Sequence, residues 1–101
     1  MLIHRWQAPH IPTPVQIKMM LESEGLEPFE EVLEKGKRIP DHRHPFDEVR
    51  MVARGELLLE ILGTRMLLRE GDRIVIPANT RHAKQASDHG DCLCICAYQV
   101  D

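Results

Sequence analysis

From residue 29 onward, hydrophobic positions fall in short runs that glycines separate. The runs that predict strands are 29–33, 39–44, 48–53, 56–62, 66–69, 73–76 and 92–100. The segment Leu62-Gly63-Thr64 has the composition of a hairpin turn. Many short strands with regularly spaced turn signals are typical of an all-β sandwich or barrel.

The first 27 residues show a different pattern. Residues 2–6 alternate weakly between apolar and polar side chains and predict a short strand, and the prolines of segment 8–14 predict a loop after it. Thr13-Pro14 is typical of a helix start, because the threonine hydroxyl caps the first turn and the first helical position needs no N–H from proline. We predict a short helix over 14–24. Its apolar stripe is predicted to consist of Val15, Met19 and Met20.

Composition narrows the class of protein. The chain has 101 residues, 43% hydrophobic and 29% charged, as expected for one folded domain. Its formal net charge of −3 argues against nucleic acid as a partner, since phosphate binding needs a basic surface. No apolar run approaches the roughly 20 residues of a membrane span, and the first 14 residues hold no apolar signal core. We therefore expect a soluble, cytoplasmic protein that binds neither nucleic acid nor membranes.

The three cysteines, Cys92, Cys94 and Cys96, lie on one predicted strand. An odd number crowded on one segment does not indicate a disulfide framework. The residues that alternate with them are also apolar or small, so the strand is predicted to be buried on both faces. We favour core packing of these thiols over a thiolate metal site, because zinc sites usually bring cysteines in a C-x2-4-C pair.

His42, His44 and Glu48 lie within seven residues of one another. On a strand, the two histidines project to the same side. Two imidazoles and a carboxylate suit a divalent transition metal. Three such ligands leave the site incomplete, and His82, just after the predicted strand 73–76, is the best candidate for a fourth. The alternative is that this cluster is a solvated surface turn.

These residues fall in two motifs that resemble those of the cupin superfamily, and of small single-domain microbial cupins in particular. Every defined position of the first cupin motif is matched by Gly36-x5-His42-x-His44-x3-Glu48-x6-Gly55. A second segment resembles the second cupin motif: Gly71-x5-Pro77-x-Asn79-x2-His82. The chain departs from the family pattern at Asn79, where the family has glycine, and at Ala86, where it often has asparagine. Asparagine tolerates a positive φ better than most residues, so we expect the turn to form.

The resemblance implies an all-β fold, the double-stranded β-helix, which is a jelly-roll-like barrel of two antiparallel sheets. One domain would span 1–101, with the N-terminal strand and helix in 1–27 and the barrel in 28–101. The resemblance also implies one divalent transition metal (Fe, Mn, Ni or Zn), with water or substrate at its remaining positions. Its protein ligands would be His42, His44, Glu48 and His82.

Proteins that resemble this chain include dioxygenases, isomerases, decarboxylases, sugar-binding proteins and regulatory domains. We expect a small metalloenzyme of dioxygenase or isomerase type, with a small anionic or enolic substrate as its ligand. The alternative is a non-catalytic metal- or ligand-binding or regulatory module. No residue is assigned as catalytic. The resemblance also implies a homodimer, formed through an outer sheet face or an exchanged N-terminal strand.

Arg50, Phe46 and Tyr98 are the candidate substrate contacts. An unbroken strand would point Arg50 into the same cavity as Glu48, where it would pair with an anionic substrate. The alternative is a solvated arginine on an irregular strand, or an ion pair with Asp47 or a neighbour. Phe46 and Tyr98 are candidates to line the mouth of the site, with simple packing as the alternative for Tyr98. The charged segment 24–37 is interpreted as a solvated strand edge. The remaining histidines are expected at the surface: His4, His10 and His89.

Overall fold

The computed structural model describes residues 2–100, which form nine strands and one α-helix. In chain order the elements are β1 (Leu2–His4), α1 (Pro14–Ser23), β2 (Phe29–Leu33), β3 (Arg38–His42), β4 (Asp47–Arg54), β5 (Leu57–Ile61), β6 (Thr64–Leu68), β7 (Arg73–Ile76), β8 (His82–Ala86) and β9 (Cys92–Gln99). Eight of the nine strands, β2 to β9, lie between Phe29 and Gln99, the part of the chain in which the glycine-bounded hydrophobic runs occur.

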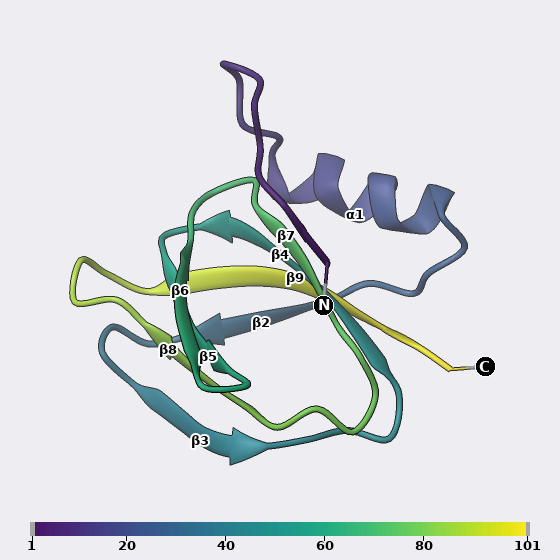
Figure 1. Cartoon of the computed structure of the whole chain (residues 1–101). Helices are drawn as coiled ribbons and strands as arrows, with labels where there is room; N and C mark the ends of the chain where they lie inside the picture. Colours follow the sequence, from purple (N-terminus) through teal and green to yellow (C-terminus); the bar gives the residue numbers. More distant parts are fainter. Residues whose placement is uncertain (1, 101) are drawn as a thin grey trace.

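The strands form two antiparallel sheets (Figure 1). One has five strands in the order β1-β7-β4-β9-β2, and the other has four in the order β3-β8-β5-β6. Neighbours in sequence often lie in different sheets, so the chain winds back and forth between the two layers. This architecture is the predicted double-stranded β-helix. It brings β3, β4 and β8, which carry the candidate ligands or lie beside them, around one end of the barrel interior.

Strands β2 and β7 match the predicted runs residue for residue, whereas β8 has no predicted counterpart. Its sequence, HAKQA, lacks the β-branched and aromatic residues that signal a strand. The segment is extended because it pairs with β3 on one side and β5 on the other. Tertiary pairing therefore decides its conformation, and local propensity does not.

Helix α1 covers the outer face of the five-stranded sheet (Figure 1). It begins with a capping box, in which the Gln16 N–H donates to Thr13 Oγ1 at 3.2 Å and the Thr13 N–H donates to Gln16 Oε1 at 2.9 Å. The predicted start is correct, but the predicted apolar stripe is correct only for Met20, which packs against the cluster beneath the helix. Ile17 and Leu21 are fully buried, while Val15 and Met19 are 63% and 61% exposed. Both pairs have i, i+4 spacing, so the periodicity alone did not distinguish them.

The cysteine-bearing strand β9 is buried on both faces, as predicted. Cys92, Cys94 and Cys96 are fully buried in the barrel interior, and Ile95 packs beneath α1 on the other face. Burial raises the pKa of Cys96 to about 12, whereas the hydrogen bond with Cys92, with the charge of Arg50, lowers the pKa of Cys94 to about 7. The burial of all three thiols, rather than their pKa values, supports the interpretation of core packing.

The segment that precedes α1 is fastened to the barrel by Asp72. This carboxylate accepts hydrogen bonds from the Trp6 N–H at 3.0 Å and from Arg5 Nη1 at 2.7 Å. It also accepts one from the Arg69 N–H at 2.9 Å. The Trp6 side chain lies against Gly71, where an added Cβ would come within 2.6 Å of Trp6 Cβ.

Among residues 2–100, α1 is the helix to consider as a membrane span, and it is too short and too polar for one.

Candidate metal centre

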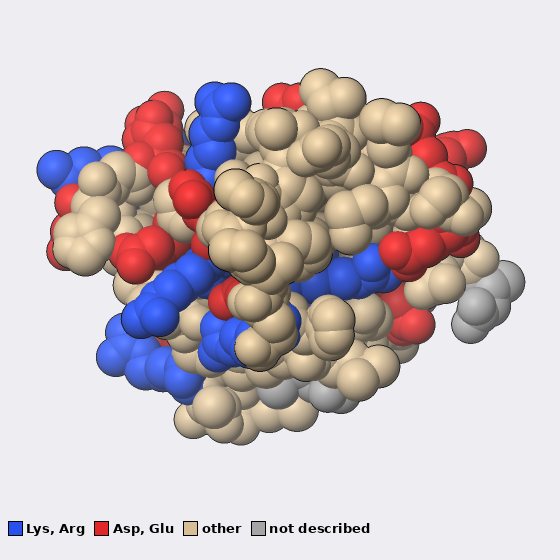
Figure 2. All heavy atoms as spheres, turned by 90° about the horizontal axis from the view of Figure 1, so that it is seen from above, with Lys and Arg blue, Asp and Glu red and all other residues tan. Residues whose placement is uncertain are grey.

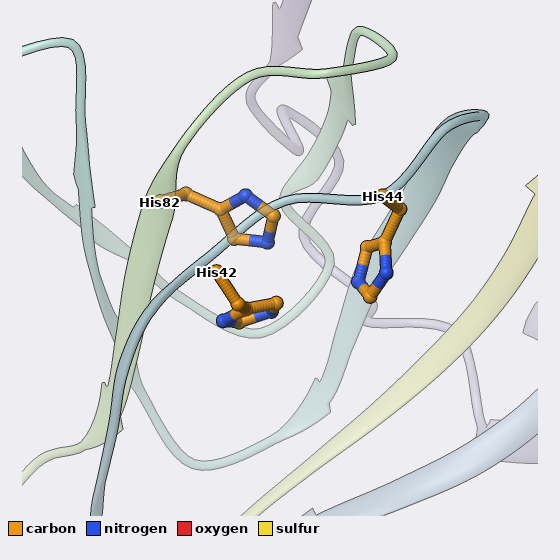
Figure 3. Close-up of side chains that lie close together, drawn as sticks. All are labelled: His42, His44 and His82. Carbon is orange, nitrogen blue, oxygen red and sulfur yellow. The ribbon is translucent and has the colours of Figure 1, made fainter.

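Three histidines from two separate segments converge at one end of the barrel (Figure 3). His42 ends β3, His44 follows in the next loop, and His82 begins β8. His42 and His82 are register partners in the four-stranded sheet. One ring nitrogen from each of the three histidines lies within 4.8 Å of the others. The two sequence motifs therefore meet, and the alternative of a solvated surface turn does not describe this cluster.

Backbone carbonyls fix the tautomers of two of these histidines. His42 Nδ1 lies 2.9 Å from the Pro40 carbonyl oxygen, and His82 Nδ1 lies 2.9 Å from the Thr80 carbonyl oxygen. A carbonyl oxygen only accepts hydrogen bonds, so Nδ1 carries the proton in each ring. Each Nε2 is left with a free lone pair, as in histidines whose second nitrogen is oriented for a metal.

Glu48 lies beside the histidines, with one oxygen close to the His44 ring. Its side chain is 1% exposed, and Oε1 lies 3.2 Å from His44 Nε2. Glu48 Oε1 and His82 Nε2 are both buried without a hydrogen-bond partner. Buried polar atoms are costly to leave unpaired, and a cation held by the three histidines would satisfy His82 Nε2. Glu48 is not part of the group of residues whose ligand atoms all lie within 4.8 Å of one another. Three imidazoles and one carboxylate fit a divalent transition metal, and the assignment of all four as ligands stays a prediction.

The surroundings of Glu48 and His82 keep these side chains in the protonation states that bind metals. Burial opposes ionisation of Glu48, but the charge and hydrogen bond of Arg50, with Lys84 and His82, hold the pKa of this carboxyl below its usual value. Burial is also the main reason that the pKa of His82 is lowered. At neutral pH, Glu48 is therefore a carboxylate and His82 is a neutral imidazole, the forms that bind metals.

Arg50 points into the barrel, as one of its two predicted alternatives requires. It is 1% exposed, and Nε donates to Glu48 Oε2 at 2.8 Å. Nη1 donates to Glu31 Oε1 at 2.8 Å. The alternative of a solvated arginine is wrong, whereas that of an ion pair with a neighbour describes what the structure shows. Asp47 is not the partner, and it accepts a hydrogen bond from the Ala78 N–H at 2.8 Å. Since two carboxylates engage Arg50, its contact with a substrate stays a prediction.

Sequence reasoning missed two interior charges, Glu31 and Lys84. Lys84 Nζ lies 2.8 Å from Glu31 Oε1 and 3.0 Å from Oε2. Glu31 was placed in a solvated strand edge, and β2 is indeed an edge strand, but this side chain faces inward. Side chains of a strand alternate between its two faces, so Glu31 shares a face with Phe29 and Leu33, which both pack into the core. This alternation in the sequence was the signal that Glu31 faces the interior.

Aromatic side chains gather beside the histidines. Phe46 stacks on His44 with ring centroids 5.2 Å apart and an interplanar angle of 5°. Tyr98 lies 4.3 Å from Phe46 and 5.0 Å from Phe29, again between ring centroids. The structure thus brings the two predicted mouth residues next to the candidate centre. The histidines expected at the surface are exposed: His4, His10 and His89.

The loop of the second motif is tied to that of the first. Asn79 has a φ of 60°, so asparagine adopts the positive φ for which the motif usually has glycine, as expected. Its N–H donates to the His44 carbonyl oxygen at 2.6 Å. This bond holds the two ligand-bearing segments together.

Four surface grooves, of about 340 to 800 Å³, are lined by other residues. The largest, of about 800 Å³, lies between the N-terminal segment and the β6–β7 region, and Trp6, Ile11 and Leu67 contribute to it. None of the three clustered histidines lines any of these four grooves.

Comparison with known proteins agrees with this geometry. A family model described as a cupin domain matches residues 29–98. Similar solved structures include the DMSP lyase DddQ from Ruegeria pomeroyi, with 23% identity and a TM-score of 0.69 over 75% of this chain and 39% of that one. A cupin protein from Bacteroides fragilis has 21% identity and a TM-score of 0.65 over 72% and 64% of the two chains. A cupin-like protein from Thermotoga maritima has 22% identity and a TM-score of 0.67 over 89% and 65%.

This chain thus spans about two fifths of the lyase and somewhat under two thirds of the other two proteins. At these identities the likeness shows the fold alone. A search of curated proteins gave no match.

Proposed function

Because this chain belongs to the cupin family, we propose that it is a metalloprotein that binds one divalent transition metal through His42, His44, His82 and Glu48. The observation that carries this proposal is the convergence of three imidazoles, with the buried His82 Nε2 lacking a hydrogen-bond partner and Glu48 Oε1 lying 3.2 Å from His44 Nε2. Fe, Mn, Ni and Zn all suit this donor set, and ligand type does not choose among them.

The proposed activity is chemistry of the dioxygenase or isomerase type on a small anionic or enolic substrate. A bound metal would supply Lewis acidity toward such a substrate. The chain's own residues would do the rest. Hydrogen bonds from Nδ1 to backbone carbonyls would leave Nε2 of His42 and of His82 available to a metal, Arg50 would hold Glu48, and Phe46 and Tyr98 would supply an apolar wall. Two matched structures are DMSP lyases, so the fold is compatible with an enzyme.

A second candidate is a non-catalytic module that binds a metal or a small ligand. The engagement of Arg50 by two carboxylates supports it, since that guanidinium offers less to a substrate.

Cobalt(II) reconstitution distinguishes these candidates, because its visible bands report coordination. The enzyme proposal expects weak bands typical of five or six ligands, which shift when azide enters an open position. His82→Ala should lose the spectrum, while His89→Ala, which removes an exposed histidine, should keep it. Intense bands that azide leaves unchanged would indicate a closed four-coordinate site and contradict the enzyme proposal.

We extend the proposal to a homodimer formed through the outer side of the five-stranded sheet. Val15 and Met19 of α1 are 63% and 61% exposed, and Leu2 of β1 is 73% exposed. Figure 2, which looks down on the α1 side, shows a broad area of uncharged side chains bordered by acidic and basic ones. Light scattering should give twice the chain mass of 11.6 kDa. A mass of 11.6 kDa at micromolar concentration would reject the dimer.

A further inference from the structure

Four charged side chains form a continuous chain inside the barrel, leading away from the candidate metal centre. Glu48 Oε2 accepts from Arg50 Nε at 2.8 Å, and Arg50 Nη1 donates to Glu31 Oε1 at 2.8 Å. Lys84 Nζ closes the chain at 2.8 Å from the same Glu31 oxygen. These side chains come from β4, β2 and β8, so both sheets contribute. Glu31 links the two cations, and its side chain is 28% exposed on an edge strand.

The charges of this chain cancel. Two carboxylates and two cations sum to zero, so Glu48 has a protein counter-ion before any metal binds. A divalent metal bound by three neutral imidazoles and Glu48 would carry about +1 if only its ligands were counted. With Arg50, Lys84 and Glu31 included, the buried region carries about +2. Uncompensated charge is costly in a region of low dielectric, and a bound anion is the usual way to reduce that cost.

We infer that the Glu31–Arg50–Lys84 network makes the metal centre dipositive, so that it selects a small anion with an oxygen or nitrogen donor, and that Glu31 sets the affinity for that anion. This inference rests on the proposed function, because it requires a bound metal. Glu31 is the residue of the network whose charge is changed most simply. Both cations pair with it, and its side chain is partly exposed to solvent.

If the network acts through its charge, Glu31→Gln and Lys84→Met should change anion affinity in opposite directions, which a purely structural role would not produce. Glu31→Gln keeps the shape of the side chain and an oxygen that accepts hydrogen bonds, but it raises the charge of the region by one. Lys84→Met keeps a chain of similar length and lowers the charge by one. If charge sets anion affinity, the first variant should bind an anion more tightly and the second more weakly. Loosened packing would weaken binding in both.

The experiment is an azide titration of the cobalt(II)-loaded full chain, followed by visible absorption at constant pH and ionic strength. We expect Glu31→Gln to lower the azide Kd roughly threefold to tenfold and Lys84→Met to raise it by a similar factor, as for one unit charge at an intermediate effective dielectric. Glu30→Gln is the matched control, because Glu30 is the adjacent residue on β2 and its exposed side chain pairs with Lys18. Its Kd should stay within about twofold of the parent value.

A neutral ligand gives a second control. Imidazole at about pH 8, where most of it is uncharged, should bind the parent and Glu31→Gln with the same affinity. If cobalt binds but azide affinity does not rise in Glu31→Gln, or falls in both charge variants, the inference is overturned while the metal site stands. If the parent protein binds no cobalt, the proposed function and the inference fall together.

Discussion

His42 on β3 lies directly opposite His82 on β8 in the register of the four-stranded sheet. The two residues are far apart in the sequence and belong to different motifs, so the sheet pairing itself assembles the candidate centre. The Asn79 N–H adds a direct bond to the His44 carbonyl oxygen between the same two segments. A change that shifts β8 against β3 would therefore separate the ligands even if every histidine were retained.

The buried face of α1 gives a first prediction about stability. Ile17→Ala should destabilise the fold by about 2–5 kcal/mol, because it leaves a cavity between the helix and the sheet. Met19→Ala, on the exposed face of the same helix, should change stability by no more than about 0.5 kcal/mol. Urea unfolding at two protein concentrations measures both and separates fold stability from dimerisation. Equal effects of the two substitutions would contradict the observed orientation of α1.

Gly71 gives a second prediction, because two constraints meet at this residue. It has a φ of 91°, and a Cβ there would lie 2.6 Å from Trp6 Cβ. Gly71→Ala should therefore destabilise the fold by about 2–4 kcal/mol, through backbone strain and the displacement of Trp6. Gly63→Ala is the matched control. Its φ is 77° but no atom lies within 4 Å of the added Cβ, so it should cost only about 1 kcal/mol.

The Gly71→Ala cost should shrink in a Trp6→Gly background, because that change removes Trp6 Cβ and the ring atoms that the added Cβ would meet, and only the backbone strain at residue 71 remains. Thermal or urea unfolding of the parent, both single variants and the double variant measures this coupling. Additive effects would mean that Trp6 does not pack on Gly71.

Asp72 gives a prediction about acid stability. Burial opposes ionisation of this carboxyl, but hydrogen bonds from the Arg69 and Trp6 N–H groups and from Arg5 hold its pKa below the usual value. A lowered pKa in the folded state contributes stability above the unfolded-state pKa of about 3.9. That stability is lost as the pH falls through the folded-state value.

Asp72→Asn should therefore be less stable than the parent at pH 7 by about 1–3 kcal/mol, from weaker hydrogen bonds to an uncharged acceptor. The difference should narrow as the pH falls below about 4. Urea unfolding at several pH values measures it. A gap that stays constant down to about pH 2 would show that the charge of Asp72 does not matter.

The sequence predicted the features that depend on local pattern. Glycine-bounded apolar runs located most strands, and the histidine spacing identified residues that the fold brings together. Three features were not predicted from the sequence, because they depend on contacts between distant segments. Strand β8 is extended through its neighbours, the buried face of α1 is chosen between two equally spaced stripes, and the partners of Glu31 come from other strands. At Glu31, the alternation of side chains along the edge strand correctly indicates an inward-facing residue, although the high charge of the surrounding segment suggests exposure to solvent.

The central claim is that two motifs assemble one metal site, and metal content tests it most directly. Mass spectrometry of the untagged protein, purified and then reconstituted separately with iron, manganese, nickel and zinc, should find about one metal per chain. His42→Ala and His82→Ala should each lose it, while His89→Ala should retain it. Absence of bound metal after every reconstitution, or full retention in both ligand variants, would contradict the account.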